Sequence, residues 1–139
     1  MEYYRKTAHS KYDLKTHIVF VTKYRKKILE GGRRIIVRDL IRQICTEIDV
    51  EIVSGKVAID HVHLFVSYPP GISVSSIVQK IKGKSSYKIL QMDKEARQIY
   101  WGRHFWSRGY LAISSGNITD EIIKEYIDDQ EGEPIQNIE

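Results

Sequence analysis

The sequence predicts an α+β fold in which an antiparallel sheet is covered by helices on one face. Two observations support this class. Segments rich in β-branched residues alternate with segments whose apolar residues recur at helical spacing, and the elements follow the order β-α-β-β-α-β with one further helix. The length of 139 residues lies within the usual range of one domain. We therefore expect a single domain over residues 1–139.

The first strand and the first helix are predicted in the N-terminal third of the chain. Residues 16–22 are rich in β-branched and aromatic types, which is typical of a buried strand. The Gly31-Gly32 pair then interrupts the chain, and residues 33–49 place apolar side chains on one helical face. This pattern predicts an amphipathic helix. Its apolar residues are Ile36, Val37, Leu40, Ile41, Ile44 and Ile48.

Two strands are predicted to follow this helix. Residues 50–59 are rich in β-branched residues, with a bulge expected at Gly55, and residues 61–67 form a second such segment. Only Asp60 separates the two segments. The connection is therefore tight, and we expect an antiparallel hairpin.

A second helix is predicted after the proline pair at residues 69–70. Ser73 or Ser75 is a suitable N-cap, and apolar residues at helical spacing continue to about Gln91. One ridge of this helix is basic, because residues four apart lie on the same face. The ridge consists of Lys80, Lys84 and Lys88.

The last two elements complete the order of the fold. Residues 104–114 predict a strand, and Asn117 is a suitable N-cap for a final helix through Gln130. The order β-α-β-β-α-β is the split βαβ pattern of a ferredoxin-like sheet. Because this architecture supports RNA binding, metal binding and catalysis alike, the function must be argued from individual residues.

The charge distribution favours a polyanionic partner. The chain has 22 basic and 18 acidic residues, a net charge of +4, but residues 128–139 hold five acids and no base. Residues 1–127 therefore carry 22 bases against 13 acids, a net charge of +9. A basic body followed by an acidic tail is typical of a nucleic-acid-binding protein, although solvated surface lysines are the common alternative.

Other features of the composition exclude several classes of protein. The single cysteine, Cys45, excludes an intramolecular disulfide and a thiolate zinc site. The longest apolar runs are far shorter than a bilayer-spanning helix requires, and the N-terminus is rich in tyrosine and charge, unlike a signal peptide. We expect a cytoplasmic protein with no membrane role.

The segment His61-Val62-His63 is a candidate metal site. Alternate residues of a strand point to the same face, roughly 6–7 Å apart along it. The two imidazoles can therefore converge on one metal ion. The alternative is that two histidines on a strand only pack or form hydrogen bonds.

Tyr126 and Gln130 form a second candidate pair, on the last helix. Because they are four residues apart, their side chains leave the same helical face. A tyrosine there offers a phenolic nucleophile, and a glutamine offers a neutral oxygen ligand for a metal. The alternative is that Tyr126 belongs to an ordinary apolar stripe, together with Ile118, Ile122, Ile123 and Ile127.

Taken together, these motifs resemble the single-tyrosine HUH transposases of small bacterial and archaeal insertion sequences, a superfamily that includes the IS200-like and REP-associated tyrosine transposases. The resemblance covers nearly the whole chain. It includes Thr-Lys-Tyr-Arg at residues 22–25, Asp-His-Val-His-Leu at 60–64, Trp-Ser-Arg-Gly-Tyr at 106–110 and the Tyr126/Gln130 pair. The fold it implies is a ferredoxin-like sheet with a C-terminal helix that carries the nucleophile.

The resemblance implies a DNA transposase that cuts and rejoins single-stranded transposon ends. On this sequence, His61, His63 and Gln130 would be the metal ligands and Tyr126 the nucleophile, which would form a 5′-phosphotyrosine intermediate. The implied cofactor is Mg²⁺ or Mn²⁺, which would polarise the scissile phosphate. Asp60 is left outside the catalytic set, because a strand neighbour of His61 points to the other face and a turn role is expected.

Single-stranded DNA binding requires a basic track with aromatic platforms. For Phe105 and Trp106, packing in the core or a dimer interface is the favoured interpretation. The candidate DNA-binding residues are Lys23, Tyr24, Arg25, Lys80, Lys84, Lys88, Arg103 and Arg108.

The resemblance also implies partners and leaves rivals open. The implied partners are hairpins of single-stranded transposon-end DNA and a second copy of the chain, in a homodimer whose tyrosine helix can complete the metal site of the partner subunit. Whether the site forms in cis or in trans stays open. The rival functions are another HUH nuclease of the replication-initiator or relaxase type, a non-catalytic ferredoxin-like module that binds RNA or single-stranded DNA, and a small metal-binding regulator.

Overall fold

The computed structural model describes residues 5–6, 11–114, 116 and 118–130. Its main sheet has four strands: β3 (Lys15–Val21), β4 (Glu51–Val57), β5 (His61–Ser67) and β6 (Leu111–Ser114). They lie in the order β4-β5-β3-β6, and every neighbouring pair is antiparallel. This is the strand order of a ferredoxin-like sheet, so the predicted α+β fold is confirmed.

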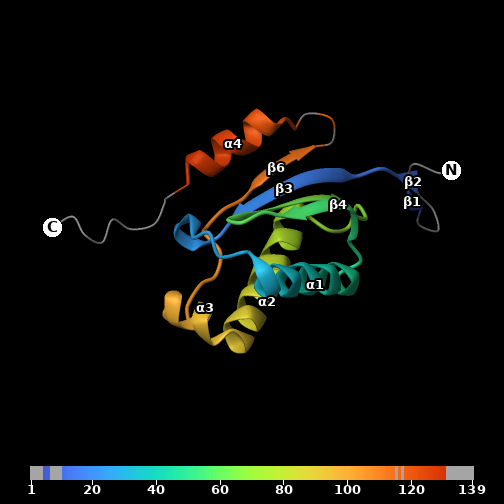
Figure 1. Cartoon of the computed structure of the whole chain (residues 1–139). Coiled ribbons are helices and arrows are strands. Elements are labelled where there is room, and N and C mark those ends of the chain that lie inside the picture. The colour runs from blue at the N-terminus through green and yellow to red at the C-terminus, as the bar shows by residue number, and fades with distance from the viewer. Residues whose placement is uncertain (1–4, 7–10, 115, 117, 131–139) are drawn as a thin grey trace.

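The helices lie on both faces of the sheet. Helices α1 (Gly31–Glu47), α2 (Val74–Met92) and the short α3 (Lys94–Ile99) lie on one side, and α4 (Asp120–Asp128) lies on the other, as Figure 1 shows. A short two-stranded hairpin, β1 (Arg5–Lys6) and β2 (Lys11–Tyr12), precedes the sheet. None of the helices in the described part of the chain has the length and apolar character that a membrane crossing requires.

The hydrophobic core lies between the sheet and helices α1 and α2. Alternate residues of the two central strands, β3 and β5, point into it, because side chains alternate along a strand. The fully buried Phe20 packs edge-on against Trp106, with the ring centroids 4.8 Å apart. The favoured interpretation of Phe105 and Trp106 as packing residues is therefore confirmed. The core includes Ile18, Phe20, Val62, Leu64 and Val66 of the sheet and Val37, Ile41, Ile44, Ile77, Val78 and Ile81 of the helices.

The predicted hairpin and the second helix are confirmed. Strands β4 and β5 pair in antiparallel register, and the turn between them is closed by a bond from the Ala58 amide to the His61 carbonyl, 2.8 Å long. Ser73 is the N-cap of α2, because its hydroxyl accepts a hydrogen bond from the Ser76 amide at 3.1 Å.

The predicted bulge at Gly55 is wrong. The register of β4 shifts between Ile52 and Ser54, whereas Gly55 stays paired with Leu64. A Cβ atom at residue 55 would lie 3.0 Å from a methyl carbon of Leu64. The glycine therefore allows a close approach between strands.

The region from residue 93 to residue 114 also differs from the prediction. Asp93 caps the additional helix α3 by accepting a hydrogen bond from the Ala96 amide at 3.0 Å. Only Leu111–Ser114 of the predicted strand 104–114 forms β6. The earlier residues do not continue the strand, because Phe105 and Trp106 fill the core and Gly109 turns the chain with a φ of +79°.

The ends of two other helices differ as well. Helix α4 begins at Asp120 with Thr119 as its N-cap, and the predicted cap Asn117 lies outside the described residues. The helix ends at Asp128, two residues before the predicted end. Helix α1 begins and ends two residues before the predicted bounds of 33–49. Within it, Ile36 of the predicted apolar face is 42% exposed, because the buried stripe runs through Val37, Ile41 and Ile44.

A matched pair of variants tests this assignment of the core. Ile41 and Ile35 lie on α1 and have relative exposures of 2% and 50%. We expect Ile41→Ala to lower the free energy of unfolding by about 2–5 kcal/mol, because it leaves a cavity, and Ile35→Ala to lower it by less than about 1 kcal/mol. Urea denaturation followed by circular dichroism measures both. Equal losses would contradict the assigned face of α1.

Candidate active site

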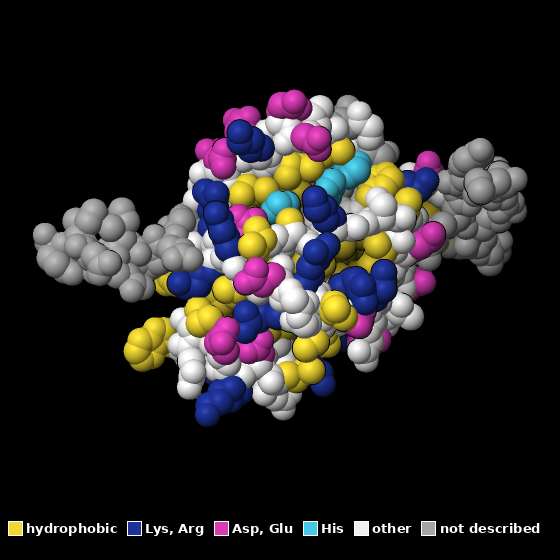
Figure 2. Space-filling view, viewed as in Figure 1, with side chains coloured by type: hydrophobic (Ala, Val, Ile, Leu, Met, Phe, Trp, Pro, Cys, Tyr) yellow, Lys and Arg dark blue, Asp and Glu magenta, His cyan; other side chains and the backbone are white. Residues whose placement is uncertain are grey.

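His61 and His63 lie on the face of the sheet opposite the main core. They pair with Val21 and Val19 across β3, and all four side chains point toward the side covered by α4. The intervening Val62 is fully buried in the core. The two imidazoles therefore share one face, as the alternation predicts. Figure 2 shows histidine side chains at the surface below α4, bordered by Lys and Arg side chains.

Asp60 orients the first of these histidines. Its Oδ1 lies 2.9 Å from Nδ1 of His61, which makes Nδ1 the protonated nitrogen when the ring is neutral and leaves the Nε2 lone pair for a ligand. The expectation that the Asp60 side chain points away from His61 is wrong. Its carbonyl does accept a bond from the Thr22 amide, 3.0 Å long, but its carboxylate contacts the candidate site. Strand alternation fails here because Asp60 lies before β5 begins.

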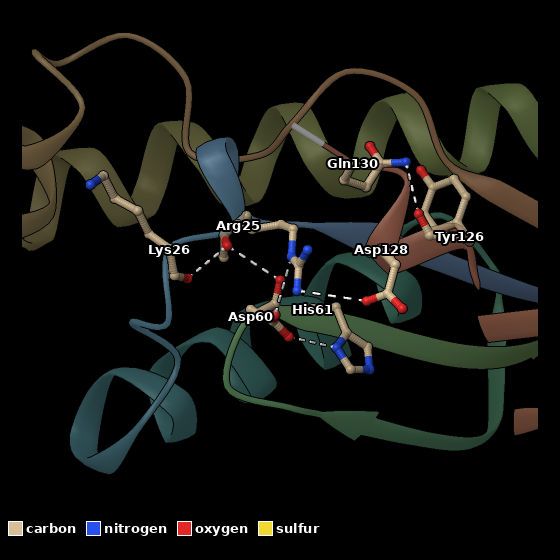
Figure 3. Close-up of polar contacts among 8 residues, drawn as sticks. Arg25, Lys26, Asp60, His61, Tyr126, Asp128 and Gln130 are labelled. Carbon is tan, nitrogen blue, oxygen red and sulfur yellow. Dashed lines mark hydrogen bonds and ion pairs between the residues drawn. The ribbon is translucent and has the colours of Figure 1, made fainter. Parts of the chain in front are cut away.

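Arg25 lies between Asp60 and the C-terminal helix. Its Nε is 3.9 Å from Oδ2 of Asp60, and its Nη2 is 3.9 Å from Oδ1 of Asp128, as Figure 3 shows. The side chain is partly buried, so this candidate DNA-binding residue lies inside the site. It connects the turn before β5 with the end of α4.

The turn that carries Arg25 has an unusual backbone. Tyr24 and Arg25 have φ values of 62° and 54°, in the left-handed region that residues other than glycine rarely adopt. Surrounding bonds hold the turn: the Thr22 hydroxyl donates to the Lys26 carbonyl at 2.7 Å, and the Tyr100 hydroxyl donates to the Lys23 carbonyl at 3.1 Å. Such strain persists where neighbouring structure fixes it, which is typical of functional sites.

His17 is a site residue that the sequence did not predict. Its Nδ1 lies 3.0 Å from Nε2 of His63, and its ring stacks on Phe65 at a centroid distance of 4.2 Å. Burial lowers the pKa of both histidines, and for His63 the neighbouring His17 and His61 lower the pKa further. A neutral His63 is what metal binding requires. In the sequence, His17 is only a histidine in the first strand. Its closeness to His63 became evident only from the pairing register of β3 and β5.

Tyr126 and Gln130 lie at the C-terminal end of α4, on the same side of the sheet as the histidines. The Thr119 hydroxyl caps the helix by accepting from the Ile122 amide at 3.2 Å, and Ile127 is the buried residue of its inner face. Tyr126 is partly buried, and burial raises the pKa of its phenol. The nucleophile candidate is therefore a neutral phenol on a helix that packs over the sheet.

The amide of Gln130 is held away from the histidines. Its Nε2 donates to the Tyr126 carbonyl at 3.1 Å, and the Ser107 hydroxyl is 3.5 Å from its Oε1. In Figure 3 the amide turns back toward Tyr126 rather than toward His61. Gln130 thus lies on the same side of the sheet as the histidines, but its side-chain oxygen contacts Ser107.

The side chains at this site offer the types of ligand atom that the predicted metal site needs, two imidazole nitrogens and an amide oxygen. Nδ1 of His61 is fixed by Asp60, whereas Nε2 of His63 must leave His17 before it can bind a metal. Within the described ranges, no group of three or more His, Cys, Asp or Glu residues is arranged to hold a metal ion. Among the other residue types near the histidines, the amide oxygen of Gln130 is suitable for Mg²⁺ or Mn²⁺. The roles of these residues as ligands stay predictions.

The remaining DNA-binding candidates lie in two places. Lys80, Lys84 and Lys88 are exposed on α2, where Lys84 is 3.7 Å from Glu47. A separate hollow of about 660 Å³ opens between α2 and the segment before β6. Its lining includes Lys23, Arg103, Arg108 and Ser107. Because Ser107 also contacts Gln130, the hollow borders the candidate active site. Tyr24 instead packs against the core.

The chain is similar to known transposases over most of its length. A family model described as "Transposase IS200 like" matches residues 10–130. The transposase for insertion sequence element IS200 of Salmonella typhimurium is 36% identical over 123 residues, which is 88% of this chain and 80% of the relative. The ISDra2 transposase TnpA of Deinococcus radiodurans is 28% identical over 119 residues, 86% of this chain and 85% of the relative.

Two solved structures are similar in fold. The crystal structure of a Deinococcus radiodurans R1 protein has a TM-score of 0.85 and 27% identity, and the match covers 92% of this chain and 98% of the other. The structure of a REP-associated tyrosine transposase bound to a REP hairpin has a TM-score of 0.55 and 15% identity, with coverage of 88% and 69%. The second similarity concerns the fold alone.

The contact between Asp60 and His61 leads to a prediction about the imidazole. We expect the neutral ring of His61 to carry its proton on Nδ1 in the native protein, and Asp60→Ala to shift it toward the Nε2–H form that free imidazole side chains favour. Nitrogen-15 NMR at pH 8 distinguishes the two tautomers. The exposed His104 is the internal control and keeps its tautomer. An unchanged His61 spectrum would show that Asp60 does not fix the ring.

Proposed function

This chain belongs to the IS200-like transposase family, and from that premise we propose that it cuts and rejoins single-stranded DNA at transposon ends through Tyr126. The observation that carries the proposal is the placement of two candidate pairs. His61 and His63 share the sheet face on which α4 lies, and that helix bears Tyr126, with Gln130 two residues beyond its end. Membership of this family implies a DNA-cleaving enzyme, so it favours this function over a non-catalytic binding module or a metal-binding regulator.

The proposed reaction is a transfer between two phosphodiesters. The Tyr126 oxygen attacks the scissile phosphorus, the bond from phosphorus to the 3′ oxygen breaks, and the phenol proton is lost while the 3′ oxygen gains a proton. The products are a 5′-phosphotyrosine and a free 3′-hydroxyl. A 3′-hydroxyl of another strand then attacks the same phosphorus and releases the tyrosine. No external energy source is needed, because each step breaks one phosphate ester and forms another.

His61, His63 and Gln130 would hold the divalent cation of this reaction. Mg²⁺ or Mn²⁺ bound there would polarise the scissile phosphate and offset its developing negative charge. Asp60 supports this role, because its carboxylate orients the ring of His61 at 2.9 Å. Arg25 holds Asp60 and Asp128 near each other and so keeps the end of α4 over the start of β5.

The hollow beside α2 is the proposed path of the DNA strand. Lys23, Arg103 and Arg108 supply cations along it, and Ser107 joins it to Gln130. The exposed lysines of α2 extend the basic surface. The REP-associated relative was solved with a DNA hairpin, which supports a hairpin at the transposon end as the substrate.

We also propose that the protein works as a homodimer in which α4 can serve either subunit. Polar contacts connect α4 with the body, among them the 3.9 Å ion pair of Asp128 with Arg25 and the 3.5 Å contact of Gln130 with Ser107. Contacts of this kind exchange between subunits more readily than a buried core does.

The first test of the proposal is a covalent adduct. Single-stranded oligonucleotides with the hairpin ends of the encoding element, incubated with the protein and Mg²⁺, should leave a labelled protein band after denaturation. Tyr126→Phe should abolish the band, because it lacks the nucleophile. Tyr68→Phe is the control: it removes a hydroxyl that lies 2.8 Å from Thr16 Oγ1 at the far end of the sheet, and it should keep the band. An adduct in Tyr126→Phe, or none in the native protein, would refute the proposal.

The second test concerns the hollow. Each phosphate contact contributes about 0.7 to the slope of log affinity against log salt for single-stranded DNA. The double variant Arg103→Gln/Arg108→Gln should therefore lower the slope by about 1.4. Arg38→Gln/Arg42→Gln removes the same charge from the exposed surface of α1 and should leave it nearly unchanged. Fluorescence anisotropy at salt concentrations from about 50 to about 300 mM measures the slopes. Equal slopes for the two variants would exclude the hollow as the DNA path.

A further inference from the structure

One lysine of α2 does not belong to the exposed ridge. The Nζ atom of Lys82 donates to the Ser107 carbonyl at 2.6 Å and to the Gly109 carbonyl at 2.7 Å. The side chain is partly buried, and burial lowers the pKa of its ammonium group to about 8. Two short hydrogen bonds from one charged donor are strong interactions. Lys82 therefore ties α2 to the segment that precedes β6.

The segment that Lys82 holds is also attached to the sheet. The Ser107 amide donates to the Val21 carbonyl at 2.8 Å, and Val21 is the last residue of β3 and the one that pairs with His61. Gly109 has a φ of +79°, a conformation that suits glycine, and this turns the carbonyl of residue 109 toward the helix. The position of Ser107 is thus fixed by two bonds from different elements.

Ser107 is also the contact of Gln130 with the body. Its hydroxyl lies 3.5 Å from Oε1 of Gln130, while Nε2 of the same amide donates to the Tyr126 carbonyl. A continuous series of contacts therefore runs from Lys82 through Ser107 to Gln130. It joins α2 on one face of the sheet to the end of α4 on the other (Figure 1).

We propose that Lys82 is a positioning residue for the active site, which sets the location of Gln130 through the segment from Ser107 to Gly109. The inference rests on the proposed function, because it gives Gln130 a role at the metal. Without the ammonium group, the carbonyls of Ser107 and Gly109 lose their charged donor and must turn to water. The Ser107 hydroxyl then moves, and the Gln130 oxygen loses its fixed partner.

A role for Lys82 as a direct phosphate contact is less well supported. Lys82 lines the hollow that is the proposed path of the DNA. Its ammonium, however, already donates to two carbonyls and is partly buried, whereas Lys80, Lys84 and Lys88 of the same helix are exposed. A phosphate contact would also give a different result. Its loss would weaken DNA binding and lower the salt slope, whereas loss of a positioning residue slows the reaction of bound DNA.

The experiment compares three variants in single-turnover adduct formation. We expect Lys82→Met to slow the reaction of bound DNA by about 10- to 100-fold, as small displacements of active-site groups do, with DNA affinity and salt slope nearly unchanged. Lys82→Arg should restore much of the rate, because guanidinium can donate to both carbonyls. Lys94→Met, at an exposed position on α3, controls for the loss of a lysine. An unaffected rate in Lys82→Met, or a loss confined to DNA affinity, would overturn the inference.

A double-mutant cycle with Gln130 separates positioning from general stability. If Lys82 acts through Gln130, adding Lys82→Met to Gln130→Ala should cause little further loss, whereas independent effects would multiply. The same cycle is measured by Mn²⁺ binding in the absence of DNA, followed by electron paramagnetic resonance. If the native protein forms no adduct, the proposed function fails, while coupling in the Mn²⁺ cycle still supports the link between Lys82 and Gln130. Multiplied effects in both measurements would refute that link.

Discussion

The antiparallel register of β3 and β5 is the constraint on which the rest of the molecule depends. Val21 pairs with His61 and Val19 with His63, so the histidines point away from the core that Phe20 and Val62 help to form. A slip of one residue would exchange the two faces and bury the imidazoles. The register therefore places the site and the core at the same time. A slipped register would expose the apolar core residues, and this cost in free energy keeps the histidines on the site face.

The sequence predicted the elements whose signal is local. Strand β5 has the predicted bounds, and α2 was predicted with Ser73 as one of two candidate caps, because alternation, helical spacing and capping depend on neighbouring residues. The bulge in β4 and the length of β6 were predicted incorrectly, because both depend on how distant segments pack. The same limit explains the site. His61 and His63 were evident from their spacing, whereas His17 and the carboxylate of Asp60 required the fold.

The candidate site combines two layers that are held in different ways. The histidines lie on central strands, where main-chain ladders and a buried core fix their backbone. Tyr126 lies on α4, and Gln130 lies two residues beyond the end of the helix. The inner face of α4 buries Ile127, and its C-terminal end meets the body through Arg25 and Ser107. The rigid layer can hold an ion, and the more loosely held layer can bring a nucleophile to it. The proposed reaction, which attaches and later releases DNA, would make use of this difference.

Polar contacts therefore decide whether the site is complete. Arg25 reaches the end of α4 from a strained turn, and Lys82 reaches it indirectly from the opposite side of the sheet. The 3.9 Å ion pair between Arg25 and the exposed Asp128 is weak, so it cannot hold the helix in place on its own. The contacts made by Arg25 and Lys82, together with the partial burial of Tyr126, favour a docked α4 but still allow the helix to detach. None of the described residues of α4 belongs to the main core, so the proposed exchange of this helix between subunits would leave the sheet and its core packed.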